Sequence, residues 1–134
     1  MIDTGVYIDY WEHRKHDDVL AEVRRTFIVR QSAVVLSELR RGARTGDARK
    51  FVERLARVAT TWWAPLDEDW WEAGRLIQAI GDSRDWDTNK RRDFQNDVLI
   101  ALTARRYGAT VVTTNRQDFA ILGRALDVSV LMVD

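Results

Sequence analysis

The last third of the chain alternates helical and β-branched segments, and this alternation constrains the fold more than any other feature. Residues 94–107 carry apolar side chains at helical spacing and run directly into Gly108, a common helix stop. Residues 109–113 are rich in β-branched side chains, and residues 128–133 close the chain with a second such run. Strands that alternate with helices predict an α/β fold with a mostly parallel sheet.

Weaker signals extend the same alternation toward the amino terminus. Residues 1–3 are predicted to be extended and 27–33 to form a buried strand, whereas 17–25 and 34–42 have helical spacing. Further along, we expect a short edge strand at 62–66, a helix at 67–81 and a polar loop at 82–90.

Length and composition indicate one globular domain over residues 1–134. The chain has a mass of 15.6 kDa, with 46% hydrophobic and 31% charged residues. It contains no cysteine, which excludes disulfides and thiolate metal sites. No apolar run approaches the roughly 20 residues of a membrane span, and no secretory signal opens the chain, so we expect a cytoplasmic protein without membrane contact.

The charged residues balance, but the cations are unusual in kind. Lysine plus arginine and aspartate plus glutamate both total 21, so composition alone does not force binding to nucleic acid. Eighteen of the 21 cations are arginine, whose planar fork suits phosphate. Arginine-rich codon usage explains the same count, so the positions of the arginines matter more than their number.

Acidic and amide side chains follow the predicted strands. Asp3 ends the first segment, Glu38 lies one turn into the helix after the second, and Asn115 and Asp118 follow residues 109–113. Asp97 lies near the start of the clearest helix. In parallel sheets ligands bind beyond the carboxyl ends of the strands, so we expect these side chains to converge there.

The helical face that carries Asp97 is otherwise made of small residues. Ala101, Ala104 and Gly108 follow Asp97 at i+4, i+7 and i+11, and small residues let a helix approach a sheet closely. Asp97 is therefore expected to point inward, where an unpaired carboxylate is costly.

Converging carboxylates repel one another and either take up protons or bind a cation. An all-oxygen set of Asp3, Glu38 and Asp97 suits Mg²⁺ or Mn²⁺. Such a metal binds phosphate oxygens and activates water, which makes phosphodiester hydrolysis the favoured reaction class. We expect Thr4, Thr113 and Thr114 to contact bound water or phosphate.

Each acid also has an ordinary structural explanation. Asp3 can cap the next helix, Glu38 can pair with Arg41 at i+3, and Asp97 can stabilise its helix through the dipole. Asp118 can lie in a solvated turn. The pattern alone leaves these alternatives open.

Four motifs in order resemble the PIN domain, in particular the VapC-type toxins of bacterial toxin–antitoxin modules. They are IDTGVYID at 2–9, SAVVLSELRRG at 32–42, NDVLIALTA at 96–104, and ATVVTTNRQDF at 109–119. Gly5 departs from the usual polar residue after Asp-Thr, which is expected to remove a hydrogen bond near the metal.

The resemblance implies a PIN-like α/β fold, with a mostly parallel sheet of four to five strands flanked by helices on both faces. It also implies an Mg²⁺- or Mn²⁺-dependent endoribonuclease that cleaves structured RNA such as tRNA or rRNA. Asp3, Glu38 and Asp97 take the three acidic positions, with Asp3 and Asp97 as the direct ligands. Either Asn115 or Asp118 fills the fourth position, which leaves one or two metal ions open.

The resemblance further implies a homodimer and a VapB-like antitoxin as partner. Arg40 and Arg116 are nearest the acids in sequence and are expected to bind RNA phosphates, although a solvated arginine face is the alternative. The pairs Trp62-Trp63 and Trp70-Trp71 cannot place both members in one core, so we expect some of them at an interface.

Two other functions remain open. The chain can be a PIN-like module that binds RNA or protein without catalysis, or a PIN nuclease in RNA processing outside a toxin–antitoxin pair.

Overall fold

Helices predominate in the computed structural model, which describes residues 1–26, 28–59 and 61–134. In chain order the elements are α1 (Thr4–His13), α2 (Asp17–Thr26), β1 (Gln31–Ser32), α3 (Ala33–Gly42), α4 (Gly46–Val58), β2 (Trp62–Trp63), α5 (Asp67–Arg84), α6 (Thr88–Arg106), β3 (Val111–Thr113), α7 (Arg116–Leu126) and β4 (Val130–Met132). The alternation of helices with parallel strands agrees with the predicted α/β class.

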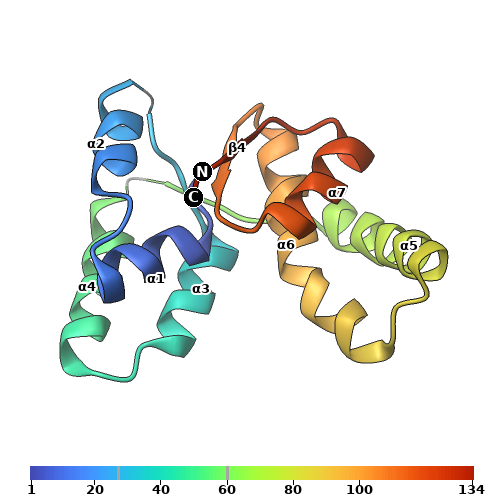
Figure 1. Cartoon of the computed structure of the whole chain (residues 1–134), viewed down its shortest axis with the longest axis horizontal. Coiled ribbons are helices and arrows are strands. Elements are labelled where there is room, and N and C mark those ends of the chain that lie inside the picture. Colours follow the sequence, from blue (N-terminus) through green and yellow to red (C-terminus); the bar gives the residue numbers. More distant parts are fainter. Residues whose placement is uncertain (27, 60) are drawn as a thin grey trace.

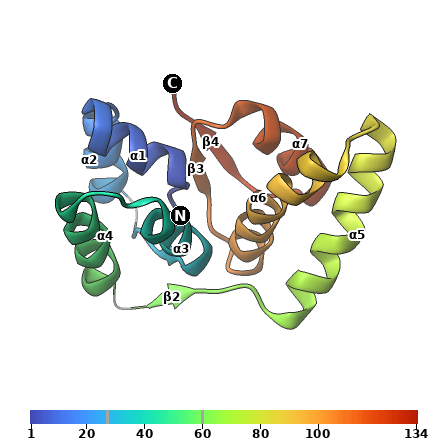
Figure 2. The same ribbon diagram turned by 90° about the horizontal axis from the view of Figure 1, so that it is seen from below.

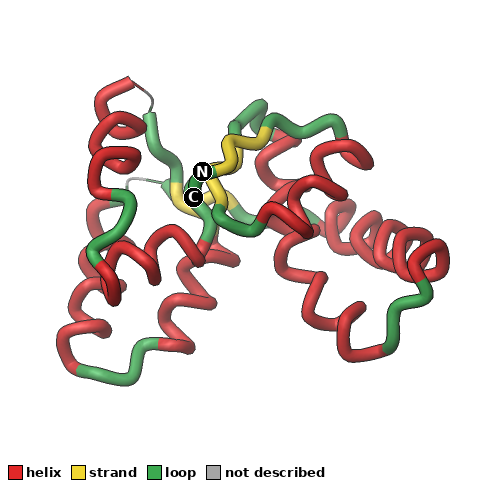
Figure 3. The backbone as a smooth tube through the Cα atoms, in the orientation of Figure 1, coloured by secondary structure: helices red, strands yellow, loops and turns green. Residues whose placement is uncertain are grey.

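The short strands lie at the centre of the molecule, between two groups of helices (Figure 3). Helices α1 to α4 form one group and α5 to α7 the other, with both chain ends between them (Figure 1). The view from below shows β3 and β4 running between the groups (Figure 2).

Strand β3 is bonded on both of its edges. On one edge the Val112 N–H donates to the Met1 carbonyl, and the Asp3 N–H donates to the Val112 carbonyl, each at 2.8 Å. On the other edge β3 pairs in parallel with β4, in the register Val112 to Leu131. The first residues of the chain and β3 therefore end side by side, which brings Asp3 to the end of β3.

The predicted sheet of four to five strands is not confirmed. In the described ranges, β1 pairs in parallel with β2 and β3 with β4, as two separate two-stranded sheets, with the single bridge from Ile2 to Val112 beside β3. The buried strand expected at 27–33 is reduced to Gln31–Ser32, because Ile28 is 79% exposed and no pairing holds it. Phe27 lies outside the described residues.

Helix α6 begins earlier than predicted and supplies the middle of the core. The Asp87 carboxylate accepts the Lys90 N–H at 2.8 Å and caps a helix that starts at Thr88. Because α5 also continues to Arg84, the loop expected at 82–90 is reduced to residues 85–87. Gly108, at φ +65°, lies in the left-handed region beyond the helix, as a helix stop requires.

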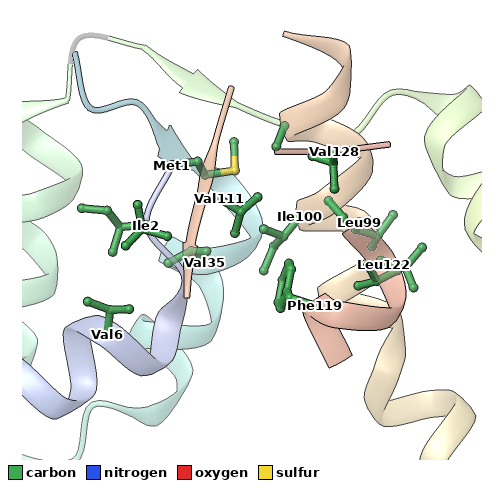
Figure 4. Close-up of a cluster of buried hydrophobic side chains, with 14 of the residues drawn as sticks. Met1, Ile2, Val6, Val35, Leu99, Ile100, Val111, Phe119, Leu122 and Val128 are labelled. Carbon is green, nitrogen blue, oxygen red and sulfur yellow. The ribbon is translucent and has the colours of Figure 1, made fainter. Parts of the chain in front are cut away.

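One hydrophobic core joins the two helical groups. Ile100, Val111 and Phe119 are fully buried at its centre, and Val35 and Val6 extend it toward α1 and α3 (Figure 4). Because α6 lies between α7 and β3, its small residues Ala101 and Ala104 are also fully buried, as the sequence predicts. Over the described residues, none of the helices combines the length and apolar character needed to cross a membrane.

Candidate active site

Asp3 is held at the end of β3 by two hydrogen bonds. Asp3 is buried, with 5% of its surface exposed. Its Oδ1 accepts the Thr4 N–H at 2.8 Å and so caps α1, and its Oδ2 accepts the Thr113 hydroxyl at 2.7 Å. Thr113 is the last residue of β3. The parallel ends of the two extended segments thus fix one carboxylate in position.

Gly5 allows the first turn of α1 to approach the loop after β3. A Cβ atom at residue 5 would lie 2.9 Å from the Thr114 hydroxyl oxygen, closer than side chains normally come. The sequence leads us to expect a lost hydrogen bond at Gly5. In the structure, the missing side chain makes room for Thr114 beside Asp3.

Glu38 reaches the same region from α3. The Ser32 hydroxyl caps this helix by accepting the N–H groups of Val34 and Val35. One turn further on, Glu38 Oε1 accepts the Thr4 hydroxyl at 2.8 Å. Thr4 therefore connects the carboxylates of Asp3 and Glu38, through its backbone to the first and its side chain to the second.

Asp97 and Asp118 are linked by one amide group. Asn115 Nδ2 donates to Asp97 Oδ2 and to Asp118 Oδ2, each at 3.2 Å. Asn115 Oδ1 accepts the Asp118 N–H and caps α7. The amide oxygen is thus used within α7, and Asn115 presents a donor, not a ligand atom, to the two carboxylates.

Lys90 is a member of this cluster that our sequence reasoning missed. Its ammonium group lies 2.9 Å from Asp118 Oδ1. A usable signal was present, because Lys90 and Asp97 are seven residues apart on α6 and so share one face of the helix.

The acids raise the pKa values of their neighbours. Burial, together with the charges of Asp3, Asp118 and Glu38, raises the pKa of Asp97 to about 8. Burial also raises the pKa of Asp3, against the hydrogen bonds from Thr113 and Thr4 that lower it. At neutral pH the Asp97 carboxyl is therefore largely protonated unless a cation replaces its proton.

The pKa of Asp118 is lowered, in contrast to those of Asp3 and Asp97. Burial disfavours its charged form, but the hydrogen bonds from Lys90 and Asn115 outweigh burial and hold the pKa of Asp118 below its usual range. Asp118 therefore remains ionised, with Lys90 as its partner.

The donor chemistry of this site fits a hard divalent cation. Asp3, Glu38 and Asp97 offer carboxylate oxygens only. Burial and, after it, the neighbouring negative charges raise the pKa values of Asp3 and Asp97, and a bound cation would offset both effects. Among the described residues, no three histidine, cysteine, aspartate or glutamate side chains are already arranged to hold a metal ion. The threonine and asparagine hydrogen bonds connect the carboxylates in this conformation, so a bound cation would require the side chains to rearrange.

The two arginines predicted to bind RNA lie apart from the acids. Arg40 is exposed on α3 two residues after Glu38, hence on another side of the helix, and it lines a cavity of about 520 Å³ beside Trp62. Arg116 is exposed at the start of α7 and pairs with Asp134 at 2.6 Å. Of the two, Arg116 is beside the cluster in sequence, next to Asn115.

A groove of about 520 Å³ lies between α1, α3 and α4 and includes Glu38 of the acidic cluster in its lining. Glu38 lines it together with Ile8, Trp11 and Phe51, and the rings of Trp11 and Phe51 stack at 5.0 Å between centroids. Ile8 is 40% and Trp11 36% exposed, so the groove presents an apolar wall to solvent.

The fold is that of an α/β protein with a cluster of carboxyl groups near the end of β3. The family model of the PIN domain matches residues 1–125. The chain therefore belongs to the PIN domain family, and the identification made from its motifs is confirmed. No curated protein sequence matches the chain significantly.

Several solved structures share this fold. VapBC2 from Rickettsia felis, bound to a DNA fragment from its promoter, matches with a TM-score of 0.71 at 17% identity, covering 100% of this chain and 98% of the other. VapBC-1 from nontypeable Haemophilus influenzae matches with a TM-score of 0.71 at 20% identity, covering 98% of this chain and 96% of the other. VapBC-5 from Mycobacterium tuberculosis is a member of the VapBC family of toxin–antitoxin systems. It matches with a TM-score of 0.62 at 26% identity, covering 98% of this chain and 96% of the other.

Proposed function

We propose that this chain is a Mg²⁺- or Mn²⁺-dependent endoribonuclease and the toxin of a VapBC-type toxin–antitoxin module. The observation that carries the proposal is the meeting of Asp3, Glu38 and Asp97, from distant parts of the sequence, at the end of β3. Membership of the PIN family and the shared fold with VapBC chains support it.

In this proposal Asp3 and Asp97 are the direct metal ligands and Glu38 completes the acidic set. A divalent ion bound there supplies positive charge that binds a phosphate oxygen and lowers the pKa of water. Thr4 and Thr113 orient the carboxylates through the hydrogen bonds already present, and Asn115 holds Asp97 toward Asp118. Asp118 is the carboxylate at the fourth position.

We assign structured RNA, such as tRNA or an rRNA loop, as the substrate. Among the described residues Arg116 pairs with the Asp134 side chain, which is 92% exposed, and an exposed ion pair of this kind contributes little stability. We therefore assign Arg116, which follows Asn115 in the sequence, as a residue that binds RNA phosphate. Arg40, on another side of α3, would contact a more distant part of the same RNA.

We further propose that a VapB-like antitoxin lies in the groove between α1, α3 and α4. A partner segment seated on Trp11 and Phe51 would lie against Glu38 and obstruct the acids. The complex purified with the product of an adjacent gene should therefore cleave RNA more slowly than the chain alone. Equal rates would contradict this placement.

The proposed homodimer is supported by exposed aromatic side chains on and before α5. Trp62, Trp70 and Trp71 are 52%, 51% and 86% exposed, and tryptophan is enriched at protein interfaces. A mass measurement in dilute solution tests it, and a monomer would exclude a stable dimer.

The nuclease proposal is tested by RNA cleavage in Mn²⁺ with two matched variants on α6. Asp97→Asn keeps the shape of the side chain and removes its charge, so we expect a loss of roughly 100-fold or more in rate. Asp93→Asn changes an acid that is 69% exposed and whose ion pair, among the described residues, is with the neighbouring Arg92, so we expect little change. EDTA should abolish cleavage by the unaltered chain.

Two results would contradict the proposal. Equal cleavage by the unaltered chain and Asp97→Asn would remove Asp97 from the reaction and point to a contaminating nuclease. RNA binding without cleavage, in Mn²⁺ and in Mg²⁺, would favour a PIN-like binding module.

A further inference from the structure

The ammonium group of Lys90 is fixed in place beside the acidic cluster. Its Nζ lies 2.9 Å from Asp118 Oδ1, 5.0 Å from the centre of the Trp86 ring and 5.5 Å from that of Phe94. Ring faces attract cations, and the side chain is only 33% exposed. These three contacts hold the positive charge of Lys90 at one position, unlike that of a lysine whose side chain extends freely into solvent.

A continuous chain of polar contacts joins this cation to Asp97. Lys90 binds one oxygen of Asp118, Asn115 Nδ2 binds the other, and the same Nδ2 donates to Asp97. Each oxygen of Asp118 is thus already bound by a donor from the protein. A metal ion that binds Asp118 through Oδ1 therefore competes with Lys90, and one that binds through Oδ2 competes with Asn115.

The charges of the cluster lead to the same result. Ionised carboxylates of Asp3, Glu38, Asp97 and Asp118 together carry four negative charges, and Lys90 offsets one of them. One divalent ion would leave a single negative charge, whereas a second would make the cluster positive. A second ion is therefore disfavoured for as long as Lys90 remains in place.

We propose that Lys90 is a positioning residue that takes, at Asp118, the place of a second divalent ion and so limits the site to one. This inference rests on the proposed metal site and answers a question that the sequence leaves open, namely whether one ion or two are bound. Removal of the Lys90 charge should create an additional divalent-ion site at Asp118.

The test is the number of Mn²⁺ ions bound per chain, measured by titration calorimetry or by electron paramagnetic resonance of free Mn²⁺. Lys90→Met keeps an apolar stem against Trp86 and Phe94 but removes the charge, so it should bind one Mn²⁺ more than the unaltered chain. Lys90→Arg keeps the charge and should bind the same number as the unaltered chain. Lys50→Met, at an exposed lysine of α4, is the matched control and should also be unchanged.

A purely structural role for Lys90 predicts a different result. If Lys90 only fastens α7 to α6, Lys90→Met should lower the melting temperature without changing the number of ions, and this outcome would overturn the inference. Lys90→Gln provides a second uncharged variant should Lys90→Met fail to fold. Absence of Mn²⁺ binding in every variant and in the unaltered chain would overturn the proposed metal site and the inference together.

Discussion

Burial of a carboxyl group in the acidic cluster lowers the stability of the metal-free protein but provides a negative charge that can bind a cation. Asp97 is half-buried near three other carboxyl groups, and its raised pKa measures the cost of ionising it there. Stabilising substitutions are therefore expected at the residues proposed to act on substrate.

Asp97→Asn should stabilise the metal-free protein at pH 8. The folded pKa of about 8 lies above the ordinary value of 3.8, so the folded state keeps a proton that the unfolded state loses between these values. The contribution of Asp97 to the free energy of unfolding is therefore fully present below about pH 4 and is lost as the pH rises toward 8. We expect a gain on the order of 2 kcal/mol for Asp97→Asn at pH 8.

The measurement is urea denaturation in EDTA at pH 5 and pH 8, with Asp93→Asn as the control. The gain should be largest at pH 8 and shrink toward pH 5. A loss of stability in Asp97→Asn at pH 8 would mean that the carboxylate is satisfied without a metal.

Sequence reasoning selected Asp3 and Asp118 because they follow predicted strands, and Asp97 because it shares a helical face with small residues. It missed Lys90, although the helical period places that residue on the face of Asp97. It also gave Arg40 a place near Glu38 on sequence distance alone, whereas two residues along a helix turn the side chain to another side. Orientation around a helix, and not distance along the chain, decides membership of the site.

At the scale of elements, α5 and α6 are joined by an ion pair between the buried Asp69 and the exposed Arg106. Asp69 Oδ1 accepts Arg106 Nη2 at 2.8 Å and Oδ2 accepts Nε at 3.1 Å, while the Asp69 side chain is 6% exposed. Asp69 Oδ2 also accepts the Leu66 N–H at the start of α5. The Asp69 carboxylate thus links α5 to α6 and also caps the first turn of α5.

Asp69→Asn should destabilise the protein more than the loss of a surface charge does, because the Asp69 carboxylate is buried and Arg106 loses its main partner. Glu72→Gln, in the exposed pair with Arg75 on the same helix, should cost less than ~1 kcal/mol. The hydrogen bond from Arg106 lowers the pKa of Asp69. The contribution is therefore present above the ordinary pKa and is lost as pH falls below it.

Chemical denaturation at pH 7 and pH 3 measures both effects. The difference between the unaltered chain and Asp69→Asn should shrink at pH 3. A Glu72→Gln variant as unstable as Asp69→Asn would show that the pair with Arg106 has no special role.

The elements differ in how far the sequence could predict them. The long helix around residues 94–107 and the strand at 111–113 follow from periodicity and β-branching. The start of α6 at Thr88 was missed, because polar residues 88–93 resemble a loop until the cap at Asp87 is seen. Strand length was overestimated at 27–33, because an apolar segment does not by itself provide a neighbour to pair with.

At the scale of the whole molecule, the central strands bring distant segments together. Residues 1–3 pair with β3, more than 100 positions away, and this pairing places Asp3 against Thr113. The core of Val35, Ile100 and Phe119 then holds α3, α6 and α7 around the same point (Figure 4). The acidic cluster is thus a property of the complete fold and is absent from the unfolded chain.

The central claim is that this cluster binds a divalent ion only when the chain is folded. Its most direct test is the melting temperature with and without Mn²⁺, for the unaltered chain and for Asp97→Asn. A ligand at 100 times its dissociation constant adds about 2.7 kcal/mol to folding, which corresponds to a rise of roughly 5 °C or more. The account predicts this rise for the unaltered chain and little or none for Asp97→Asn, and an unaltered chain whose melting temperature ignores Mn²⁺ would contradict it.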